Sequence, residues 1–335
     1  MSAIARLPLR SRPWRVLVEL GIVLASFIVL LVVTGFRFYW ITDFLIFCIL
    51  VLSYDLLYGY LGSLSFGHML YYGTGAYMAA CWVAYFNGSP ILALLAAVVV
   101  TGVIAAAVGW IAVQTHGAAF ALLTMAFNEL GYFVVHTPLS PITKGDDGLI
   151  LSPDPLLGFL RFGRDEQAFI VVLIVFLAVF LFLRLLTRSP FGIMTRSIKE
   201  NETRVKFLGY GTHRYKWITF IVAAMIAALA GGLFALVQGF VSPRAISTLS
   251  NIEIIFAILI GGSGSLYGAI VGGVILMLIK NYLPTLIGSL EQSMGVALPQ
   301  WELWLGIVLL IVVFAFRKGV VGFVHSLRRR ATSDA

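Results

Sequence analysis

Residues 189–217 read SPFGIMTRSIKENETRVKFLGYGTHRYKW, a polar segment with long apolar runs on both sides. Of the 335 residues, 60% are hydrophobic and 11% are charged, whereas a soluble domain is about one quarter charged. Apolar stretches of about 20 residues can cross a bilayer, and such stretches fill most of the chain. The sequence therefore predicts an all-α, polytopic transmembrane helical bundle, with residues 1–335 forming a single membrane domain.

The apolar runs give nine candidate spans, and the last but one is unusually long. It carries GGSGSLYG near its middle, so we expect it to divide at 261–264. The division gives about eight to ten membrane segments, including Gly-interrupted or re-entrant helices, and it places both basic ends of the chain on one side. The candidate spans are 16–36, 38–59, 64–87, 90–113, 117–136, 168–186, 215–241, 253–282 and 301–317.

The basic residues are concentrated in three regions. Of the 23 Lys and Arg residues, four lie in 1–15, eight in 184–216 and five from position 317 onward. The loop at 137–167 instead holds five acids against three basic residues. By the positive-inside rule, the tails at 1–15 and 318–335 and the loop at 187–214 are expected to be cytoplasmic. The loop at 137–167 is expected to be external.

Other readings of the composition are less well supported. The net charge of +8 does not indicate nucleic-acid binding, because the basic residues are not interleaved with aromatic residues on one soluble face. The apolar run after Arg15 is longer than a secretory h-region, so we expect an uncleaved first span. Cys48 and Cys81 lie in apolar runs, where they give neither a disulfide framework nor a metal cluster.

Two Gly-rich stretches share one pattern. YGYLGSLSFGHMLYYGTGAY and GGSGSLYG both contain G-S-L followed by an aromatic residue and Gly. Paired breaks in apolar segments indicate broken helices along a substrate path, while the alternative is close helix packing through small residues. The first reading predicts path residues in and beside the breaks, namely Asp55, Ser63, Ser65, His68, Gly262 and Ser263.

Polar side chains at membrane depth are costly, about 2.5 to 3.5 kcal/mol for an ionised group at a helix centre. Asn128 and Glu129 lie deep in LLTMAFNELGYF, where they either line a polar path or are neutralised by a neighbouring helix. His68 is either a path residue or a structural histidine. Five further groups lie near span ends, where they are expected to be solvated or to cap helices: Asp43, Gln114, His116, Gln238 and Glu253.

The polar segment contains residues that are typical of helix starts and helix ends. Ser189 is a candidate N-cap with Pro190 at the first helical position, and Gly209 is a candidate stop. Apolar and charged residues alternate between them, which predicts an amphipathic helix or helix pair on the cytoplasmic surface. It either docks a partner or only sets topology and binds anionic lipid. The docking reading assigns coupling roles to Pro190, Phe191, Arg196, Lys199, Glu200, Asn201, Glu202 and Arg204.

The chain contains no G-x-x-x-x-G-K-[ST] phosphate loop, no nucleophile elbow and no H-E-x-x-H zinc site. We therefore expect a protein that is not an enzyme and has no cofactor and no metal. A docking helix without an energy-converting motif implies that another subunit supplies the energy.

Four stretches in consistent order resemble LivM-like permeases of branched-chain amino acid ABC transporters. They are LSYDLLYGYLGSLSFGHMLYYGTGAYMAA, SPFGIMTRSIKENETRVKFLGY, YKWITFIVAAMIAALAGGLFALVQGFVSP and IEIIFAILIGGSGSLYGAIVGG, and the similarity covers about residues 40–325. Three positions depart from the residues common in the family: Asp55 replaces Asn, Ser63 replaces Gln and Ala269 replaces Pro.

The resemblance implies a subunit of an importer in a bacterial plasma membrane. Its expected partners are a second related permease, two cytoplasmic ATPase subunits and a periplasmic or lipid-anchored binding protein, with lipid around it and no nucleic acid. The ATPases would grip residues 190–209 as the coupling helix. Solutes in this family include branched-chain and other amino acids, urea, short amides and aromatic or organic acids.

Two rival functions remain at this point. An ion-coupled secondary transporter suits the paired Gly-rich breaks, but it leaves the large basic loop unexplained. A membrane-embedded enzyme would need convergent catalytic groups, and the scattered polar residues offer none.

Overall fold

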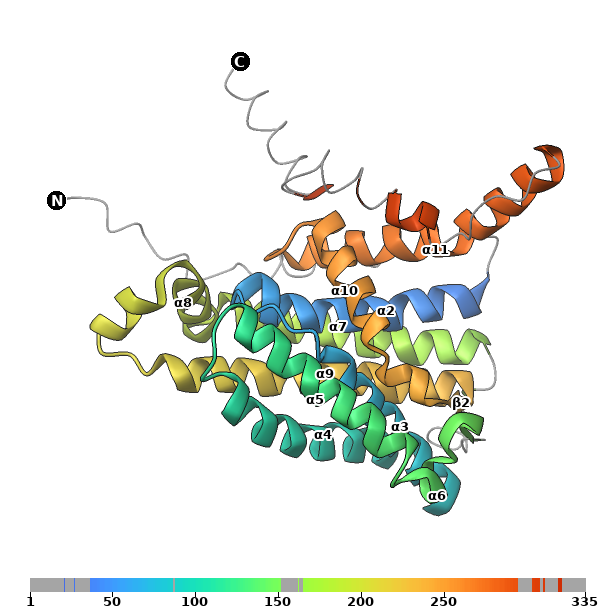
Figure 1. The fold of residues 1–335 in the computed structure, drawn as a ribbon, viewed down its shortest axis with the longest axis horizontal. Coiled ribbons are helices and arrows are strands. Elements are labelled where there is room, and N and C mark those ends of the chain that lie inside the picture. Colours follow the sequence, from blue (N-terminus) through green and yellow to red (C-terminus); the bar gives the residue numbers. More distant parts are fainter. Residues whose placement is uncertain are drawn as a thin grey trace.

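Figure 1 shows the protein, a computed structural model, as an elongated bundle with α8 at one end and with α6 and β2 at the other. We call these the α8 end and the opposite end. The structure describes residues 37–86, 88–151 and 165–294, together with 21, 27, 162, 303–307, 310 and 319–320. The predicted spans at 16–36 and 301–317 and the two predicted tails lie wholly or largely outside the described residues.

The described part is helical except for two strands of two residues each, so the predicted all-α class is confirmed at that level. The elements in order are α2 (Phe38–Asp55), the π-helical turn η1 (Leu56–Tyr60), α3 (His68–Phe86), α4 (Pro90–Ala112), α5 (Ala118–His136), α6 (Ser140–Thr143), the 3-10 turn η2 (Gly145–Asp147), β1 (Leu149–Ile150), α7 (Asp165–Arg188), α8 (Pro190–Phe207), α9 (Thr212–Gln238), β2 (Phe240–Val241), the 3-10 turn η3 (Pro243–Ile246), α10 (Thr248–Gly261) and α11 (Leu266–Met294).

Eight of the predicted segments fall within the described residues once 253–282 is divided, and six helices there are long and apolar enough to cross a membrane. Two predicted segments differ from the expectation. The segment predicted at 64–87 begins as a helix only at His68 and is not among the six. α10 has 14 residues, about 21 Å of helix at about 1.5 Å per residue, so it is shorter than a bilayer core of about 30 Å.

Burial separates central helices from peripheral ones. The most apolar window of Phe38–Tyr60 is 83% buried, against 33% for Pro90–Ala112 and 28% for Ala118–His136. α2 packs against α7, α9 and α11, and a helix that is apolar on all sides is expected at such a central position. The exposed apolar faces of α4 and α5 are suited to lipid or to another membrane subunit.

Helices α3 and α9 approach each other closely because small residues face one another. A Cβ placed on Gly231 would lie 1.9 Å from the Tyr72 carbonyl oxygen, and one on Gly75 would lie 2.2 Å from the Ala228 carbonyl oxygen. Small residues of this kind allow membrane helices to pack backbone against backbone. The contact fixes α3 against the centre of the bundle.

The long apolar run at 253–282 divides as predicted. α10 ends at Gly261, and α11 begins at Leu266. Gly262 and Gly264 between them have φ of 106° and 78°, a left-handed conformation that glycine adopts at no steric cost. The two helices form a tight hairpin, since a Cβ on Gly272 would lie 1.9 Å from the Ala257 carbonyl oxygen.

At the opposite end, β1 and β2 form an antiparallel pair that matches Leu149 with Val241 and Ile150 with Phe240. The pair connects the segment after α6 to the chain that leaves α9. Near it, His136 Nε2 lies 3.0 Å from Asp146 Oδ2. The described part of the 137–167 loop is therefore attached to the bundle.

We expect Gly231→Ala to destabilise the protein by about 1 to 3 kcal/mol, because the added methyl group overpacks the α3–α9 contact. The measurement is the thermal unfolding midpoint of the purified protein in detergent. Gly288→Ala is the matched control, because a Cβ there meets no atom within 4 Å and Ala is the better helix former. Equal midpoints for the two variants would contradict the packing argument.

Candidate functional site

Two helices begin inside the bundle, and their first turns meet. The backbone N–H of Met69, at the start of α3, donates to Asn251 Oδ1 on α10 at 3.0 Å. The side chain of Ser247 caps α10 by accepting from the Leu249 N–H at 3.3 Å. Helix N-termini carry partial positive charge, and such ends inside a membrane suit anionic or polar groups. The meeting point of α3 and α10 is therefore the first candidate site.

Asn128 and Glu129 on α5 both reach this meeting point. Asn128 is fully buried, and its Nδ2 donates to the Ile246 carbonyl at 2.7 Å and to Thr248 Oγ1 at 3.0 Å. The Thr248 hydroxyl in turn donates to Glu129 Oε1. The Glu129 residue is exposed on the outside of the bundle. A carboxylate thus lies on an apolar helix face, beside the beginning of α10.

His68 lies at the first residue of α3 and is buried. Its Nε2 lies 2.8 Å from the Ser53 hydroxyl, and its ring packs edge-on against Tyr54 and Tyr71. Within the described residues, Nδ1 has no hydrogen-bond partner. The Ser53 contact and the tight packing fit the structural reading of this histidine better than the path reading.

The first Gly-rich break is an ordered loop at 61–67. The Tyr54 hydroxyl donates to the Ser65 carbonyl at 2.8 Å, and Ser65 Oγ accepts from the Gly67 N–H at 3.2 Å. A Cβ on Gly67 would lie 2.1 Å from the Thr124 carbonyl oxygen. These contacts hold the loop against α5, which explains why α3 begins later than predicted.

The second Gly-rich break contacts the end of α2. The Gly264 N–H donates to Asp55 Oδ1 at 2.8 Å, and a Cβ on Gly59 would lie 2.4 Å from the same nitrogen. Asp55 is fully buried, and its Oδ2 has no hydrogen-bond partner among the described residues. The two Gly-rich breaks, about 200 residues apart, therefore meet at one π-helical turn.

The same turn is held from α8. Lys199 Nζ donates to the Gly59 carbonyl at 2.7 Å. The guanidinium of Arg196 lies 4.5 Å from the centre of the Tyr60 ring, a cation–π contact. The helix that was predicted to dock a partner is thus attached to both Gly-rich breaks through residues 59 and 60.

α8 begins and ends at the predicted residues. Ser189 caps it by accepting from the Gly192 N–H, Pro190 occupies the first turn, and the chain turns at Gly209 with a φ of 86°. Asn201 has an extended backbone, with φ of −160°, and its Oδ1 accepts from the Arg204 N–H at 2.9 Å. α8 is therefore a helix pair, and Asn201 caps the second helix.

Glu202 joins the second helix to its neighbours. Its oxygens lie 2.6 Å from Lys216 Nζ, 3.0 Å from Lys206 Nζ and 3.2 Å from His116 Nε2, and they accept from Thr212. Partial burial raises the pKa of Glu202, but hydrogen bonds from Lys216, Lys206 and Thr212 and the charge of Lys216 lower it more, to about 2. Glu202 is therefore ionised at neutral pH and fixes α8 to α9 and to the turn after α4.

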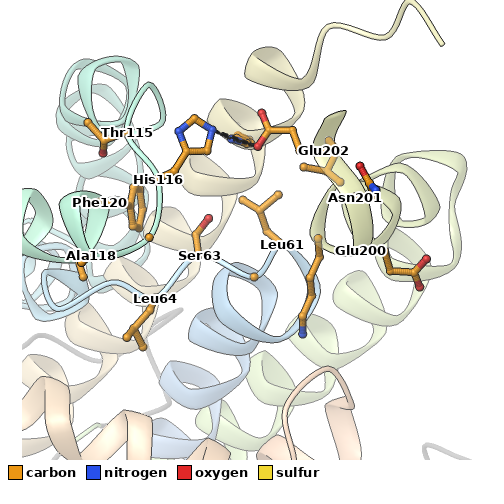
Figure 2. A pocket seen from close by; sticks show the side chains of 16 residues that line it. Leu61, Ser63, Leu64, Thr115, His116, Ala118, Phe120, Glu200, Asn201 and Glu202 are labelled. Carbon is orange, nitrogen blue, oxygen red and sulfur yellow. Dashed lines mark hydrogen bonds and ion pairs between the residues drawn. The ribbon is translucent and has the colours of Figure 1, made fainter. Parts of the chain in front are cut away.

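Glu202, Lys216 and His116 are among the residues that line a hollow of about 730 Å³ at the α8 end. Figure 2 shows Ser63 and Leu64 of the first break on one side, His116 with Thr115 on another, and Glu200 to Glu202 opposite them. The side chains of His116 and Glu202 point toward each other across the opening. The hollow lies between the loop at 61–64 and α8, so a movement of α8 would change its shape.

The structure divides the predicted path residues between two places. Asn128 and Glu129 lie at the start of α10, with His68 at the start of α3. Asp55, Ser63, Gly262 and Ser263 lie at or near the α8 end, and Ser65 supports the loop between the two. Of the predicted coupling residues, Phe191 stacks on Tyr215 with ring centres 5.5 Å apart, while Pro190, Glu200 and Arg204 are exposed.

The five predicted span-end residues have more specific contacts than solvation alone. At the opposite end, Asp43 accepts from Gln238 at 3.1 Å. Just after α4, at the α8 end, Gln114 donates to the Trp110 carbonyl at 3.0 Å. Glu253 accepts from Lys280 at 2.7 Å. Sequence reasoning did not single out Lys216, Thr248 or Asn251, because their partners lie far away in the chain. Among the described residues, no group of three or more His, Cys, Asp or Glu is placed to bind a metal ion.

Residues 36–315 match the family model described as "Branched-chain amino acid transport system / permease component". The chain is 27% identical over 291 residues to the high-affinity branched-chain amino acid transport system permease protein LivM of Escherichia coli (strain K12), covering 76% of this chain and 67% of that protein. It is 26% identical to LivH of the same organism, covering 69% and 79%, and 24% identical to BraD of Pseudomonas aeruginosa, covering 82% and 91%. No solved structure matches the chain.

We expect Glu202→Gln to destabilise the protein on the order of 2 kcal/mol, because it removes charged hydrogen bonds and leaves the buried Lys216 ammonium without its anion. The readout is the thermal unfolding midpoint. The double variant Glu202→Gln with Lys216→Met should recover part of the loss.

Because the folded-state pKa of Glu202 lies below its ordinary value of 4.5, the stabilisation is present above that value and is lost as the pH falls toward about 2. Glu200→Gln is the control, since Glu200 is exposed and should change stability by less than about 0.5 kcal/mol. A loss as large for Glu200→Gln as for Glu202→Gln would refute the assignment.

Proposed function

The chain belongs to the family of permease components of branched-chain amino acid transport systems, and we propose that it is one of two permeases in an ATP-driven importer. It is a multi-pass membrane protein and a transport permease, not an enzyme. In this proposal a second related permease completes the translocation path. Two ATPase subunits dock at the α8 end, and a periplasmic or lipid-anchored binding protein delivers solute at the opposite end.

The proposed orientation follows from charge. The α8 end carries the eight Lys and Arg residues of 184–216, whereas the loop at 137–167 carries five acids. Under the positive-inside rule, the α8 end is cytoplasmic and the opposite end is external. The same rule makes both basic tails cytoplasmic, and the protein resides in a bacterial plasma membrane.

One observation carries the coupling assignment: α8 is attached on one side and exposed on the other. On the attached side, Lys199 and Arg196 hold residues 59 and 60, and Glu202 holds Lys216. On the other side, Glu200, Arg204, Phe207 and Leu208 are exposed, and Phe207 is 88% exposed. An exposed face with apolar and charged groups suits docking of a protein partner.

The attachments suggest how docking would drive transport. A ligand-dependent partner shifts a conformational equilibrium only if it binds the two states differently. The ATPases would hold α8 differently with and without nucleotide. Movement of Lys199 would then displace the π-helical turn, and with it Asp55 and the 262–265 hairpin turn.

The proposed solutes are branched-chain amino acids, because the similar permeases from Escherichia coli and Pseudomonas aeruginosa carry that name. Urea, short amides and aromatic or organic acids are the alternative solutes. The proposed path runs past the start of α10, where Glu129 and Asn128 lie, between this chain and the second permease.

The test of this function is leucine uptake into vesicles that contain the complete complex with ATP inside. We expect ATP-dependent uptake by the unmodified complex. We expect Glu200→Ala together with Arg204→Ala to lower uptake at least about tenfold while ATP hydrolysis continues, because the α8 face loses its partner contacts.

Ser197→Ala on the same helix is the control, because its hydroxyl only donates to the Ile193 carbonyl. Uptake driven by an ion gradient without ATPase subunits would support a secondary transporter instead. Normal uptake by the double variant would refute the docking face.

Glu129→Leu should reduce uptake with assembly intact, because it removes a carboxylate from the proposed path. Glu129→Gln keeps the acceptor for the Thr248 hydroxyl and isolates the effect of the charge. Met125→Leu, one turn away on the same exposed face, is the control. Unchanged uptake by Glu129→Leu would mean that this residue serves only to hold the start of α10.

A further inference from the structure

A second cavity lies at the α8 end, where α7, the first helix of α8 and the start of α11 meet. It has a volume of about 250 Å³ and shares no lining residue with the hollow beside Glu202. Arg184, Thr187 and Arg188 of α7 and Arg196 of α8 form much of its wall, and we call it the arginine pocket. Sites for whole small molecules typically occupy about 300 to 1,000 Å³, so this pocket suits a single compact group.

The charge of the arginine pocket has one sign. Arg184 is 2% exposed, whereas Arg188 and Arg196 are exposed. No Asp or Glu is among the lining residues that the structure describes; Asp55 accepts from the Gly264 N–H but does not line the pocket. Three guanidinium groups around one small cavity repel one another, and an anion between them relieves the repulsion. The arginine pocket is therefore suited to an anion.

α11 begins at the wall of the same pocket. The Ser265 carbonyl accepts from the Ala269 N–H at 2.9 Å, and its side chain accepts from the Gly268 N–H at 3.4 Å, so Ser265 caps the helix. Leu266 and Tyr267, the first two residues of α11, line the pocket. A helix start offers partial positive charge and N–H donors to phosphate oxygens, and guanidinium groups bind the same oxygens in two-point contacts. Phosphate is thus the anion that both features favour.

The arginine pocket lies where an apolar helix leaves the membrane. α7 is one of the six candidate spans, and Ile174, Phe182 and Leu185 on it are exposed apolar residues. Arg188 is its last residue. Lipid phosphates lie in the headgroup regions that border the hydrocarbon core, and basic pockets between membrane helices bind anionic headgroups. The position therefore favours a lipid phosphate over a soluble one.

We propose that the arginine pocket binds the phosphate group of an anionic phospholipid, with its three arginines around the phosphate oxygens. The inference requires only that the chain is a membrane protein, so it stands with or without the proposed importer. Phosphatidylcholine carries the same phosphate, but its trimethylammonium group would bring a further positive charge to the arginines. Tyr60 and Gly264 also line the pocket, so a bound headgroup would hold the end of α7 against the π-helical turn and the 262–265 turn.

Lipid binding by the purified full chain tests the proposal. Native mass spectrometry from detergent micelles with one added lipid gives the apparent Kd of the first bound lipid molecule. For the unmodified chain, we expect this Kd to be at least about tenfold lower for phosphatidylglycerol than for phosphatidylcholine, the difference expected from one charged hydrogen bond. The comparison uses no variant, so it does not depend on the folding of a mutant. Equal Kd values for the two lipids would overturn the proposal.

Single substitutions locate the bound lipid. Arg188→Gln and Arg196→Gln, made separately at exposed positions, should each raise the Kd for phosphatidylglycerol at least about tenfold. Arg214→Gln is the matched control, because it removes the same charge from an exposed position at the same end, on α9, and Arg214 does not line the pocket. We expect it to change the Kd by less than about twofold. Equal losses in Arg188→Gln and Arg214→Gln would show that affinity follows overall charge and would overturn the pocket.

Inorganic phosphate distinguishes a lipid headgroup from a soluble anion. Millimolar ammonium phosphate replaces ammonium acetate at equal ionic strength during the phosphatidylglycerol titration. We expect the Kd for the lipid to change by less than about twofold, which would support the lipid as the source of the phosphate. Displacement of the lipid by inorganic phosphate in the unmodified chain, but not in Arg188→Gln, would assign the pocket to a soluble phosphate and overturn the lipid source.

Discussion

The fold depends on one polar junction at the end of its most buried helix. At the π-helical turn after α2, the Asp55 carboxylate accepts from the Gly264 N–H and the Gly59 carbonyl accepts from Lys199. A Cβ on Gly59 would collide with the Asp55 carboxylate. Only glycine at position 59 therefore allows the π-helical turn, the 262–265 turn and α8 to meet. Asp55 is fully buried, and a buried polar group that loses its hydrogen-bond partner costs about 1 to 3 kcal/mol. The junction is therefore stable only while all of its members are in place.

The helix punctuation and the Gly-rich breaks could be predicted because their causes are local. The Ser189 side chain caps the first turn of α8, and Pro190 occupies its first position. The glycines at 262 and 264 end the helix because they adopt a positive φ. The amphipathic character of α8 also follows from residue spacing alone. For these features, the sequence contains the whole physical reason.

What could not be predicted depends on partners far apart in the chain. Nothing in the sequence near Asp55 indicates that its carboxylate accepts a hydrogen bond from the N–H of residue 264. Nothing near Glu253 indicates its ion pair with Lys280. The late start of α3 has the same origin, because Gly67 packs against the Thr124 backbone of α5 and not against its own neighbours in sequence. The short length of α10 is likewise set by η3 and by the Ser247 cap, which direct the chain into the bundle before the helix begins.

The extended backbone at Asn201 divides α8 into two short helices that are attached to different parts of the bundle. The first contacts the π-helical turn through Lys199, and the second is held to α9 through Glu202. A partner bound to the first helix would therefore act on the Gly-rich hairpin through one side chain. A partner bound to the second would act first on α9, so the place of contact along α8 decides which helices respond.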